Sequence, residues 1–288
     1  MSLSIKDIET ILKETPMADL PAKMDEFRSD DRGGVQKLIV KYEKLIEKKN
    51  KEHERLDNMF YFENKYRAEC PVICGIDEVG RGPFAGPVVA GAVILPADVV
   101  KEWAEGIRQQ SVVPGSAGDG ELLGAGAWMN IEGLNDSKQV PVKRREALYD
   151  EITSKAVAYG IGAIPPARID EVNIRNATME AMKLAVEDLG VVPDLLLIDA
   201  MTLKDLPIRQ VDIVKGDARS LSIAAASIVA KVTRDRMMDT YAEVYPEYHF
   251  DKNAGYGTAE HIAALKKYGP CPLHRRSFIG KILGETNI

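Results

Sequence analysis

Acidic residues recur where short apolar runs end, and such positions suit metal-ion chemistry. Asp77 and Glu78 follow "PVICGI", Asp199 ends "LLLID", and Asp217 follows "VDIVKG". One such acid is usually a turn or helix-cap residue, but three strand ends with acids are harder to explain in that way. If the strands are neighbours, they bring four carboxylates together, and cations must then neutralise them. Carboxylate oxygens suit Mg²⁺ or Mn²⁺, and a pair of these ions would support phosphodiester cleavage.

The glycines that follow the first two acids allow a rival interpretation as a nucleotide-binding loop. Gly80, Gly82 and Gly86 give GxGxxxG rather than the GxGxxG of dinucleotide-binding folds, and two carboxylates stand where a pyrophosphate would approach. An aspartyl phosphatase would need an acid two residues after its nucleophile, where this chain has Val79. The four histidines form no recognisable Ser/His/Asp pattern. These alternatives are therefore rejected in favour of a metal site.

The elements that must position the acids begin at residue 71. Strand-length apolar runs alternate there with amphipathic helical patterns, and this alternation predicts an α/β domain over residues 71–288. The predicted strands are "PVICGI", "VVAGAVIL", "AVAYGIGAI", "DLLLIDA" and "RQVDIV", and the main predicted helices are "RREALYDEITSKA", "ATMEAMKLAVEDLG", "SIAAASIVAKVTRDRMMDTYAEVY" and "AEHIAALKKYG". The segment 96–133 is rich in glycine and is expected to be an exposed loop.

Residues 1–70 are predicted to form a helical extension with little core of its own. Ser4 and Asp7 make a capping-box pattern ahead of an apolar stripe. The sequence "DRGG" at 31–34 breaks the chain, and a long, partly exposed helix is expected to follow it. Two roles stay open for this extension: a packing appendage, or an arm that docks a partner or nucleic acid.

Composition narrows the class of protein. The chain has 288 residues, of which 45% are hydrophobic, so one main domain is expected. No apolar stretch is long enough to span a membrane, and acids interrupt the N-terminus where a signal peptide needs an apolar core, so a cytoplasmic protein is expected. The three cysteines, Cys70, Cys74 and Cys271, suggest neither a disulfide framework nor a zinc site. The net charge is −6, but the last 38 residues are basic. A cation-binding centre with a basic flank would give this distribution, and solvated helix faces, the commoner cause, give it too.

Several motifs in fixed order give the chain a family resemblance. They are "GIDEVGRGPFAGPVVAGAVIL", "LNDSK", "LLIDA", "KGDARSLSIAAASIVAKVTRDRMM", "NAGYGTAEH" and "GPCPLHRRSF". Over about residues 71–280 the sequence resembles ribonuclease HII, the bacterial type-2 ribonuclease H. The "GRG" after the acids favours this branch over ribonuclease HIII. The resemblance implies an RNase H-like mixed sheet flanked by helices, with C-terminal helices included in the domain.

The resemblance also implies a reaction and a site. Members of the family cleave the RNA strand of RNA/DNA hybrids and nick on the 5′ side of a ribonucleotide embedded in duplex DNA, leaving 3′-hydroxyl and 5′-phosphate ends. That activity belongs to ribonucleotide excision in DNA replication and repair. By motif, the metal-binding acids are Asp77, Glu78, Asp199 and Asp217, the same four found at the strand ends.

Substrate contacts follow from the same motifs. Gly80, Arg81 and Gly82 would meet the ribose 2′-hydroxyl through main-chain groups, because that hydroxyl distinguishes RNA from DNA. Tyr256 would pack against the sugar on the 3′ side of the junction, and Lys138 would contact a phosphate. Further phosphate contacts are expected from the basic residues Lys231 and Arg234 and from the "HRRSF" tail.

Two other functions remain open at this stage. A catalytically silent hybrid-binding protein would have the fold without cleavage, although the presence of all four acids speaks against it. A nuclease acting on junction DNA would use similar acids but would need no 2′-hydroxyl sensor. Two departures from the family pattern concern the substrate groove: the long connection from Leu95 to Leu134, and "DSKQVP" in place of the more common "DSKKL".

Overall fold

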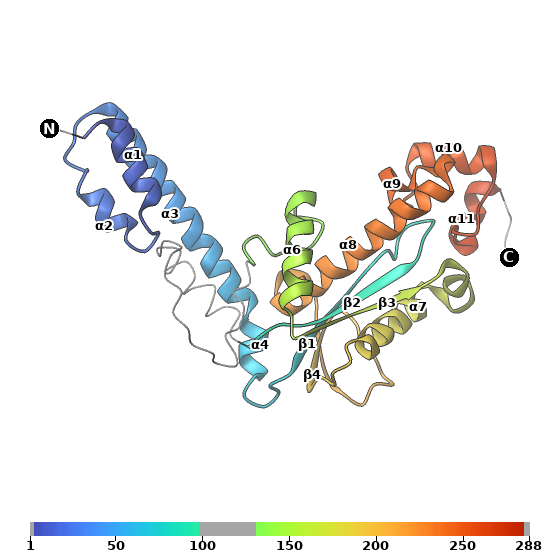
Figure 1. Ribbon diagram of the computed structural model, residues 1–288. Coiled ribbons are helices and arrows are strands. Elements are labelled where there is room, and N and C mark those ends of the chain that lie inside the picture. Colours follow the sequence, from blue (N-terminus) through green and yellow to red (C-terminus); the bar gives the residue numbers. More distant parts are fainter. Residues whose placement is uncertain (1–2, 98–130, 285–288) are drawn as a thin grey trace. The chain divides into compact units, whose positions relative to one another are not determined.

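The computed structural model describes residues 3–97 and 131–284 (Figure 1). Most of the predicted glycine-rich loop lies outside these residues. The described chain forms two compact units, one of residues 3–58 with 131–132 and one of residues 59–97 with 133–284. The domain boundary predicted at residue 70 stays a prediction, but helix α4 (Tyr61–Tyr66) packs with the second unit.

The first unit contains three helices and a small core. They are α1 (Ile5–Glu14), α2 (Leu20–Asp25) and α3 (Gly33–Met59). The capping box of Ser4 and Asp7 is confirmed, and the long helix begins inside the predicted break. The expectation of little core is wrong, because the three helices bury Ile8, Leu12, Leu20, Met24, Val35, Leu38, Ile39 and Tyr42 against one another.

The second unit is built on a mixed sheet of five strands, and all five predicted strands are confirmed. The order across the sheet is β3-β2-β1-β4-β5. Strand β1 pairs with β2 in the antiparallel sense and with β4 in the parallel sense, so the carboxyl ends of β1, β4 and β5 share one edge. The strands are β1 (Ile73–Val79), β2 (Val88–Ile94), β3 (Ala158–Ile164), β4 (Leu195–Asp199) and β5 (Arg209–Ile213).

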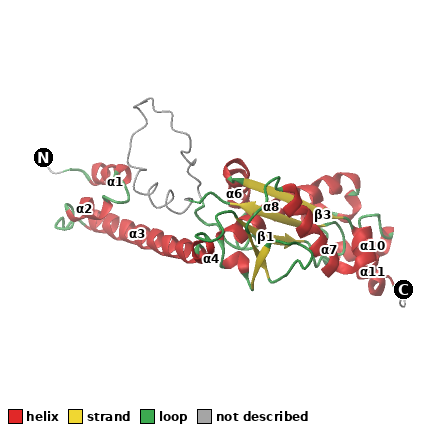
Figure 2. Ribbon diagram, turned by 90° about the horizontal axis from the view of Figure 1, so that it is seen from below, coloured by secondary structure: helices red, strands yellow, loops and turns green. Residues whose placement is uncertain are grey.

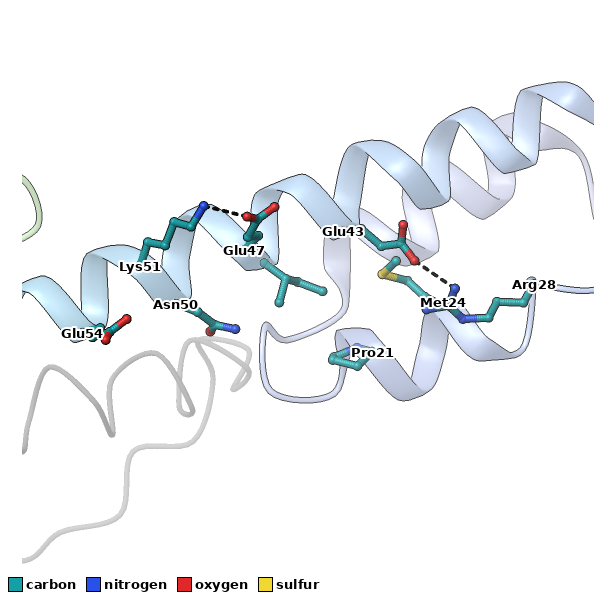
Figure 3. Close-up of a pocket in the computed structure, with 9 residues that line it drawn as sticks. Pro21, Met24, Arg28, Glu43, Glu47, Asn50, Lys51 and Glu54 are labelled. Atoms are coloured by element: carbon teal, nitrogen blue, oxygen red, sulfur yellow. Dashed lines mark hydrogen bonds and ion pairs between the residues drawn. The ribbon is translucent and has the colours of Figure 1, made fainter.

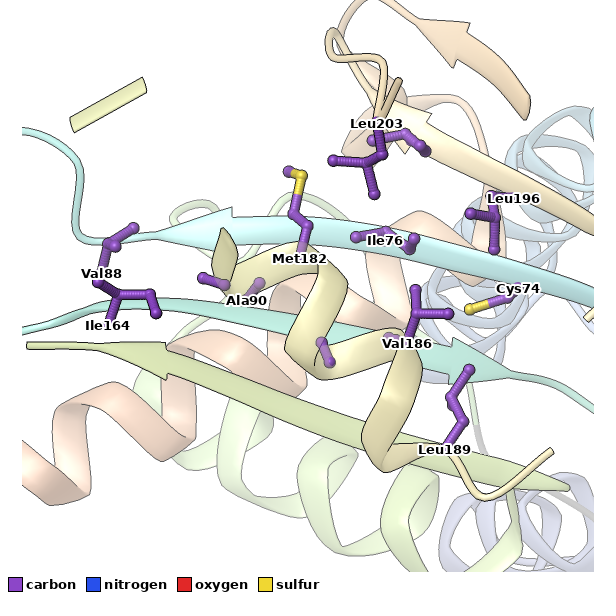
Figure 4. Close-up of a cluster of buried hydrophobic side chains, with 14 of the residues drawn as sticks. Cys74, Ile76, Val88, Ala90, Ile164, Met182, Val186, Leu189, Leu196 and Leu203 are labelled. Carbon is purple, nitrogen blue, oxygen red and sulfur yellow. The ribbon is translucent and has the colours of Figure 1, made fainter. Parts of the chain in front are cut away.

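Helices cover both faces of the sheet (Figures 1 and 2). Helix α7 (Pro166–Asp188) packs on one face through Ala181, Met182, Ala185 and Val186, which join Ile76 and Leu196 in the main apolar core (Figure 4). Helix α8 (Leu221–Val244) lies on the other face, where it also contacts α6 (Val142–Lys155).

Helix α8 approaches the sheet very closely. A Cβ atom at Gly75 would lie 2.0 Å from the main-chain carbon of Ser222, so only glycine fits this position on β1. The helix is also anchored at its N-terminus, where the Ser220 hydroxyl and the Ser222 N–H both donate to the buried Glu63 of α4, at 2.6 and 2.9 Å. The start of α8 is therefore fixed from both sides.

Short helices complete the C-terminal part of the unit. They are α9 (Phe250–Asn253), α10 (Ala259–Tyr268) and α11 (Arg276–Leu283). The sequence predicts α10 individually, and the family resemblance implies C-terminal helices in general. Thr258 caps α10, since its hydroxyl accepts from the N–H of His261, and Gly269 ends it. An isolated bridge between Ala85 and His274 connects this region to the chain after β1.

Candidate active site

The sheet places two of the four acids on the same face. Ile76 pairs with Ile198 in the parallel register, so Asp77 and Asp199 occupy the next positions on neighbouring strands. Side chains alternate along a strand, and Asp77, like Gly75, points to the α8 side. Leu197, two residues before Asp199, packs against Ile223 of α8, so Asp199 also belongs to that face. The observed register therefore brings this pair together, as expected if the strands are neighbours.

Asp217 reaches the same edge from the loop after β5. It lies in a short 3₁₀ turn (Gly216–Ala218) between β5 and the N-terminus of α8. The N–H of Gly216 donates to Oδ1 of Asp199 at 2.8 Å, and this bond ties the turn to the end of β4. Two residues that flank the site, Ala200 and Lys215, have left-handed main chains, with φ of 47° and 56°. Such strain is common at functional sites.

Glu78 starts from the opposite face because it follows Asp77 directly on the strand. One of its oxygens, Oε1, accepts from Nη1 of Arg81 at 3.0 Å, and its other oxygen, Oε2, is buried with no hydrogen-bond partner. An orphaned carboxylate oxygen is costly, and a bound cation would satisfy it.

The negative charge of Asp199 raises the pKa values of the other three acids. Burial raises the pKa of Asp77 well above its usual value, and the charges of Glu78 and Asp199 raise it further. Burial also raises the pKa of Glu78, against the lowering effect of Arg81, and Asp199 adds to the increase. The pKa of Asp217 is raised by burial and by the charges of Asp136 and Asp199. The charge of Asp199 thus connects the four carboxylates electrostatically.

These residues fit a cation by their chemistry, although they do not yet form a closed ligand set. Within residues 3–97 and 131–284, no three His, Cys, Asp or Glu side chains converge closely enough to hold a metal ion as they stand. Glu78 forms an ion pair with Arg81. The assignment of the four acids as metal ligands stays a prediction.

Two buried serines support Asp77, and the sequence reasoning missed both. Ser227 of α8 hydrogen-bonds the Asp77 carboxylate. Its hydroxyl also lies 2.9 Å from the hydroxyl of Ser137, which belongs to the "NDSK" motif. Arg145 of α6 in turn donates to the carbonyl of Ser137 at 3.0 Å. This chain of bonds fixes Asp77 from behind. The 90 positions between the two serines explain why no local signal shows it.

The "GRG" segment is held from inside by a buried arginine. Arg275 is fully buried, and its guanidinium donates to the carbonyls of Gly80 at 2.6 Å, Arg81 at 2.9 Å and Gly86 at 2.8 Å. The peptide bonds are trans, so the N–H that follows each carbonyl points the opposite way. The N–H groups of Arg81 and Gly82 therefore point away from the guanidinium.

Arg234 has a similar structural role. It is fully buried on α8 and donates to the carbonyls of Ala85, Pro87 and Ala254. The expectation that Arg234 contacts phosphates is therefore wrong, and the same holds for Arg275 of the "HRRSF" tail. Both guanidiniums are buried and bind main-chain oxygens of the protein itself.

The other expected substrate residues have exposed positions. Tyr256 is 43% exposed, and a methyl group at Gly82 would lie 3.8 Å from its ring carbon Cε1, so the ring stands beside the "GRG" segment. Lys138 is exposed, and its charge lowers the pKa of Asp217, which places it near the acids. Lys231 instead forms an ion pair with Asp235 at 2.6 Å. Asp136 accepts from the N–H of Lys138 as a turn residue does.

Comparison with protein families gives this geometry a context. A family model described as ribonuclease HII matches residues 125–281, and a second, the ribonuclease HII N-terminal domain, matches residues 4–67. The chain belongs to the ribonuclease HII family. Similar curated proteins are the ribonuclease HII of Lachnoclostridium phytofermentans, 48% identical over 97% of this chain and 98% of the relative, and that of Enterococcus faecalis, 47% identical over 94% and 93%. The chain is therefore a type-2 ribonuclease H, an endoribonuclease.

Solved structures agree on the fold. The ribonuclease H2 of Pyrococcus horikoshii matches with a TM-score of 0.55 and 24% identity, over 74% of this chain and 97% of that one. A ribonuclease HII from Archaeoglobus fulgidus, solved in complex with PCNA, gives 0.52 and 22%, over 71% and 93%. Bst-RNase HIII in complex with Mn²⁺ gives 0.51 and 16%, over 74% and 68%. At these identities the likeness concerns the RNase H-like fold.

A basic hollow of this ribonuclease HII lies beside the "GRG" segment. It has a volume of about 530 Å³, and Ala200 to Thr202, which follow Asp199, form part of its wall. Its charged lining residues are Arg81, Arg175, Lys183, Lys204, Asp205 and Asp212. Arg81 pairs with Glu78 and Lys183 pairs with Asp205. Arg175 and Lys204, against Asp212, give the hollow an excess of positive charge that suits an anionic ligand such as a nucleic-acid backbone.

The N-terminal unit has a hollow of its own, of about 410 Å³, between α2 and α3 (Figure 3). Ion pairs of Arg28 with Glu43 and of Lys51 with Glu47 line it, around Met24. Because these charges already neutralise one another, no chemistry is assigned there.

No helix in the described ranges is both long and apolar enough to cross a membrane.

Proposed function

We propose that this ribonuclease HII is a metal-dependent endoribonuclease that cleaves the RNA strand of RNA/DNA hybrids and nicks on the 5′ side of a ribonucleotide embedded in duplex DNA. The products are 3′-hydroxyl and 5′-phosphate ends. The observation that carries the proposal is that Asp77, Glu78 and Asp217, whose pKa values are raised, gather around Asp199, and that Glu78 has an orphaned oxygen. A related protein, Bst-RNase HIII, has been solved in complex with Mn²⁺, in agreement with that charge.

Asp77, Glu78, Asp199 and Asp217 would hold the ions, and Asp199 is central among them because its charge acts on the other three. When bound, two Mg²⁺ or Mn²⁺ ions supply an activated water and neutralise the leaving oxygen. The protein's own groups set the geometry. Ser227 orients Asp77, and the Gly216 N–H orients Asp199. Both carboxylates are thus pre-positioned before an ion arrives.

Recognition of the ribose is assigned to the N–H groups of Arg81 and Gly82. Their outward direction follows from the inward direction of the carbonyls that Arg275 binds. A 2′-oxygen placed between this segment and Tyr256 would accept from these N–H groups, and a deoxyribose would leave them without a partner. Tyr256 would pack on the neighbouring sugar, while Lys138 and the cations of the basic hollow would contact phosphates.

The test is cleavage of a labelled DNA duplex that contains one ribonucleotide, with Mg²⁺, with Mn²⁺ and with a chelator. A metal-dependent nick on the 5′ side of the ribonucleotide is expected, with no cut in a matched all-DNA duplex. Cleavage of a long RNA/DNA hybrid alone would retain the carboxylate site and remove the junction specificity. No cleavage of either substrate would favour a silent hybrid-binding protein, and cleavage of the all-DNA duplex would favour a junction nuclease.

Gly82→Ala is expected to leave the melting temperature unchanged and to weaken cleavage of the ribonucleotide duplex by about tenfold or more. The added methyl group meets no protein atom closer than 3.8 Å, so the fold has room for it, but it occupies the space between the segment and Tyr256. Thermal melting and kcat/KM provide the measurement.

Gly80→Ala is the matched control for this glycine. Gly80 has a φ of +89°, and its Cβ would lie 2.3 Å from Nε of Arg234, so this variant should melt at a lower temperature. Wild-type kcat/KM for Gly82→Ala would show that no ribose approaches this segment.

A further inference from the structure

A buried chain of hydrogen bonds connects a cysteine, two histidines and the loop that carries Tyr256. Cys271 and His274 lie before α11, and His261 lies on α10. Nε2 of His274 is 3.0 Å from Nε2 of His261, and Nδ1 of His261 is 2.8 Å from the carbonyl oxygen of Tyr256. The side chains of Cys271, His274 and His261 are each at most 8% exposed.

The bonding partners determine where each proton sits. The N–H of Cys271 donates to Nδ1 of His274 at 3.0 Å, so this nitrogen carries no proton, and a neutral ring must carry it on Nε2. That Nε2–H then donates to Nε2 of His261. The proton of a neutral His261 is consequently on Nδ1, from where it donates to the Tyr256 carbonyl. Only this pair of tautomers satisfies every contact.

The surroundings favour two neutral rings. Tyr248 stands edge-on to His274, with ring centroids 4.8 Å apart, and Phe250 stands edge-on to His261 at 5.5 Å. Burial lowers the pKa of His261. Burial, together with the charges of His261 and Arg276, lowers the pKa of His274 to about 4. A proton added to Nε2 of His261 would face the Nε2–H of His274 head to head.

The loop at the end of this chain needs such support. Ala254 and Gly255 both have left-handed main chains, with φ of 47° and 82°. The Tyr256 carbonyl accepts from His261 and also from the N–H of Thr258 at 2.9 Å. These bonds hold the main chain of Tyr256, so they fix the position from which its side chain extends. The exposed ring of that side chain stands beside Gly82.

We propose that His261 and His274 form a neutral relay, locked in one pair of tautomers, that positions Tyr256 against the "GRG" segment. They are positioning residues, since neither ring is exposed to a ligand. The inference rests on the proposed role of Tyr256 at the sugar. The relay consists of the hydrogen bonds that connect Cys271, His274, His261 and Tyr256.

Two substitutions at one position separate positioning from packing. His274→Leu removes the donor to His261 and keeps an apolar side chain. His274→Gln can place its amide nitrogen near the former Nε2 and so keep the donor. His249→Asn is the matched control, because His249 is exposed and asparagine tolerates its left-handed main chain, with φ of 52°.

Nitrogen-15 NMR of the full-length protein reads the tautomers without any substrate. The expected result is Nε2–H on His274 and Nδ1–H on His261 near neutral pH. In cleavage assays, His274→Leu should lower kcat/KM by about tenfold or more, while His274→Gln and His249→Asn stay close to wild type. In a Tyr256→Ala background, His274→Leu should lower kcat/KM little further, since it acts through Tyr256.

Each other result overturns the inference. A charged imidazole or the opposite tautomer on His274 would exclude the relay, and that measurement does not depend on activity. Full additivity of His274→Leu with Tyr256→Ala would show that the histidine acts elsewhere. Failure of the proposed function is visible separately, as absence of cleavage by the wild-type protein.

Discussion

Asp77→Asn is expected to abolish cleavage and, in the metal-free protein at neutral pH, to raise the melting temperature. The loss of activity should reach about a thousandfold, the upper range for removal of one electrostatic group at a reacting centre. Asparagine can still accept from Ser227, so the local hydrogen bonding survives. What disappears is a buried negative charge close to Glu78 and Asp199.

The sign of the stability change follows from the raised pKa of Asp77. The folded protein binds this proton more tightly than the unfolded chain, in which an aspartate titrates near pH 3.9. The stabilising effect of that proton is complete below the unfolded pKa and is lost as pH rises through the folded pKa. At neutral pH the ionised carboxylate therefore destabilises the metal-free fold, and asparagine removes this cost.

Melting curves with and without Mg²⁺, at several pH values, check the prediction. The difference between variant and wild type should shrink on acidification, and Mg²⁺ should raise the melting temperature of wild type more than that of the variant. Glu243→Gln, an exposed acid on α8, is the control for a simple change of charge. A less stable Asp77→Asn protein at neutral pH would contradict the electrostatic account.

The sequence predicted the sheet and the acids well because both depend on local patterns. Apolar runs define the strands, and a strand ending on an acid carries that information within a few residues. The alternation of side chains then explains the part that was not predicted. Glu78 follows Asp77 directly, so the two start on opposite faces, and Glu78 is bound to Arg81 rather than to a ready ligand set.

The arginines show where sequence reasoning fails. Arg234 and Arg275 read as solvent-facing cations because arginine usually is one. Their burial depends on loop carbonyls that the fold brings from far away, and 195 positions separate Arg275 from Gly80. The same applies to Ser137 and Ser227, which have no shared local motif. Helix α2 has only six residues, too few for a clear periodic pattern.

Arg275→Met is expected to destabilise the protein by about 2–4 kcal/mol and to weaken discrimination between ribose and deoxyribose. Methionine fills much of the volume but donates nothing, so three carbonyls, of Gly80, Arg81 and Gly86, lose their partner. Each buried orphan costs about 1–3 kcal/mol, and removal of a poorly solvated charge offsets part of the loss. Burial and the charge of Arg234 lower the pKa of Arg275 to about 9, which shows that this offset exists.

The neighbouring Arg276 provides a matched control for Arg275→Met. It is exposed, so Arg276→Met should leave the melting temperature unchanged. If Arg276 contacts a phosphate, its replacement should reduce the slope of log affinity against log salt by about 1.

Arg275→Met should leave that slope unchanged, because its guanidinium contacts the protein's own main chain. Instead it should lower kcat/KM for the ribonucleotide duplex, since the N–H groups of Arg81 and Gly82 lose their fixed direction. A stable Arg275→Met protein with a reduced salt slope would reverse this assignment and make Arg275 a phosphate ligand.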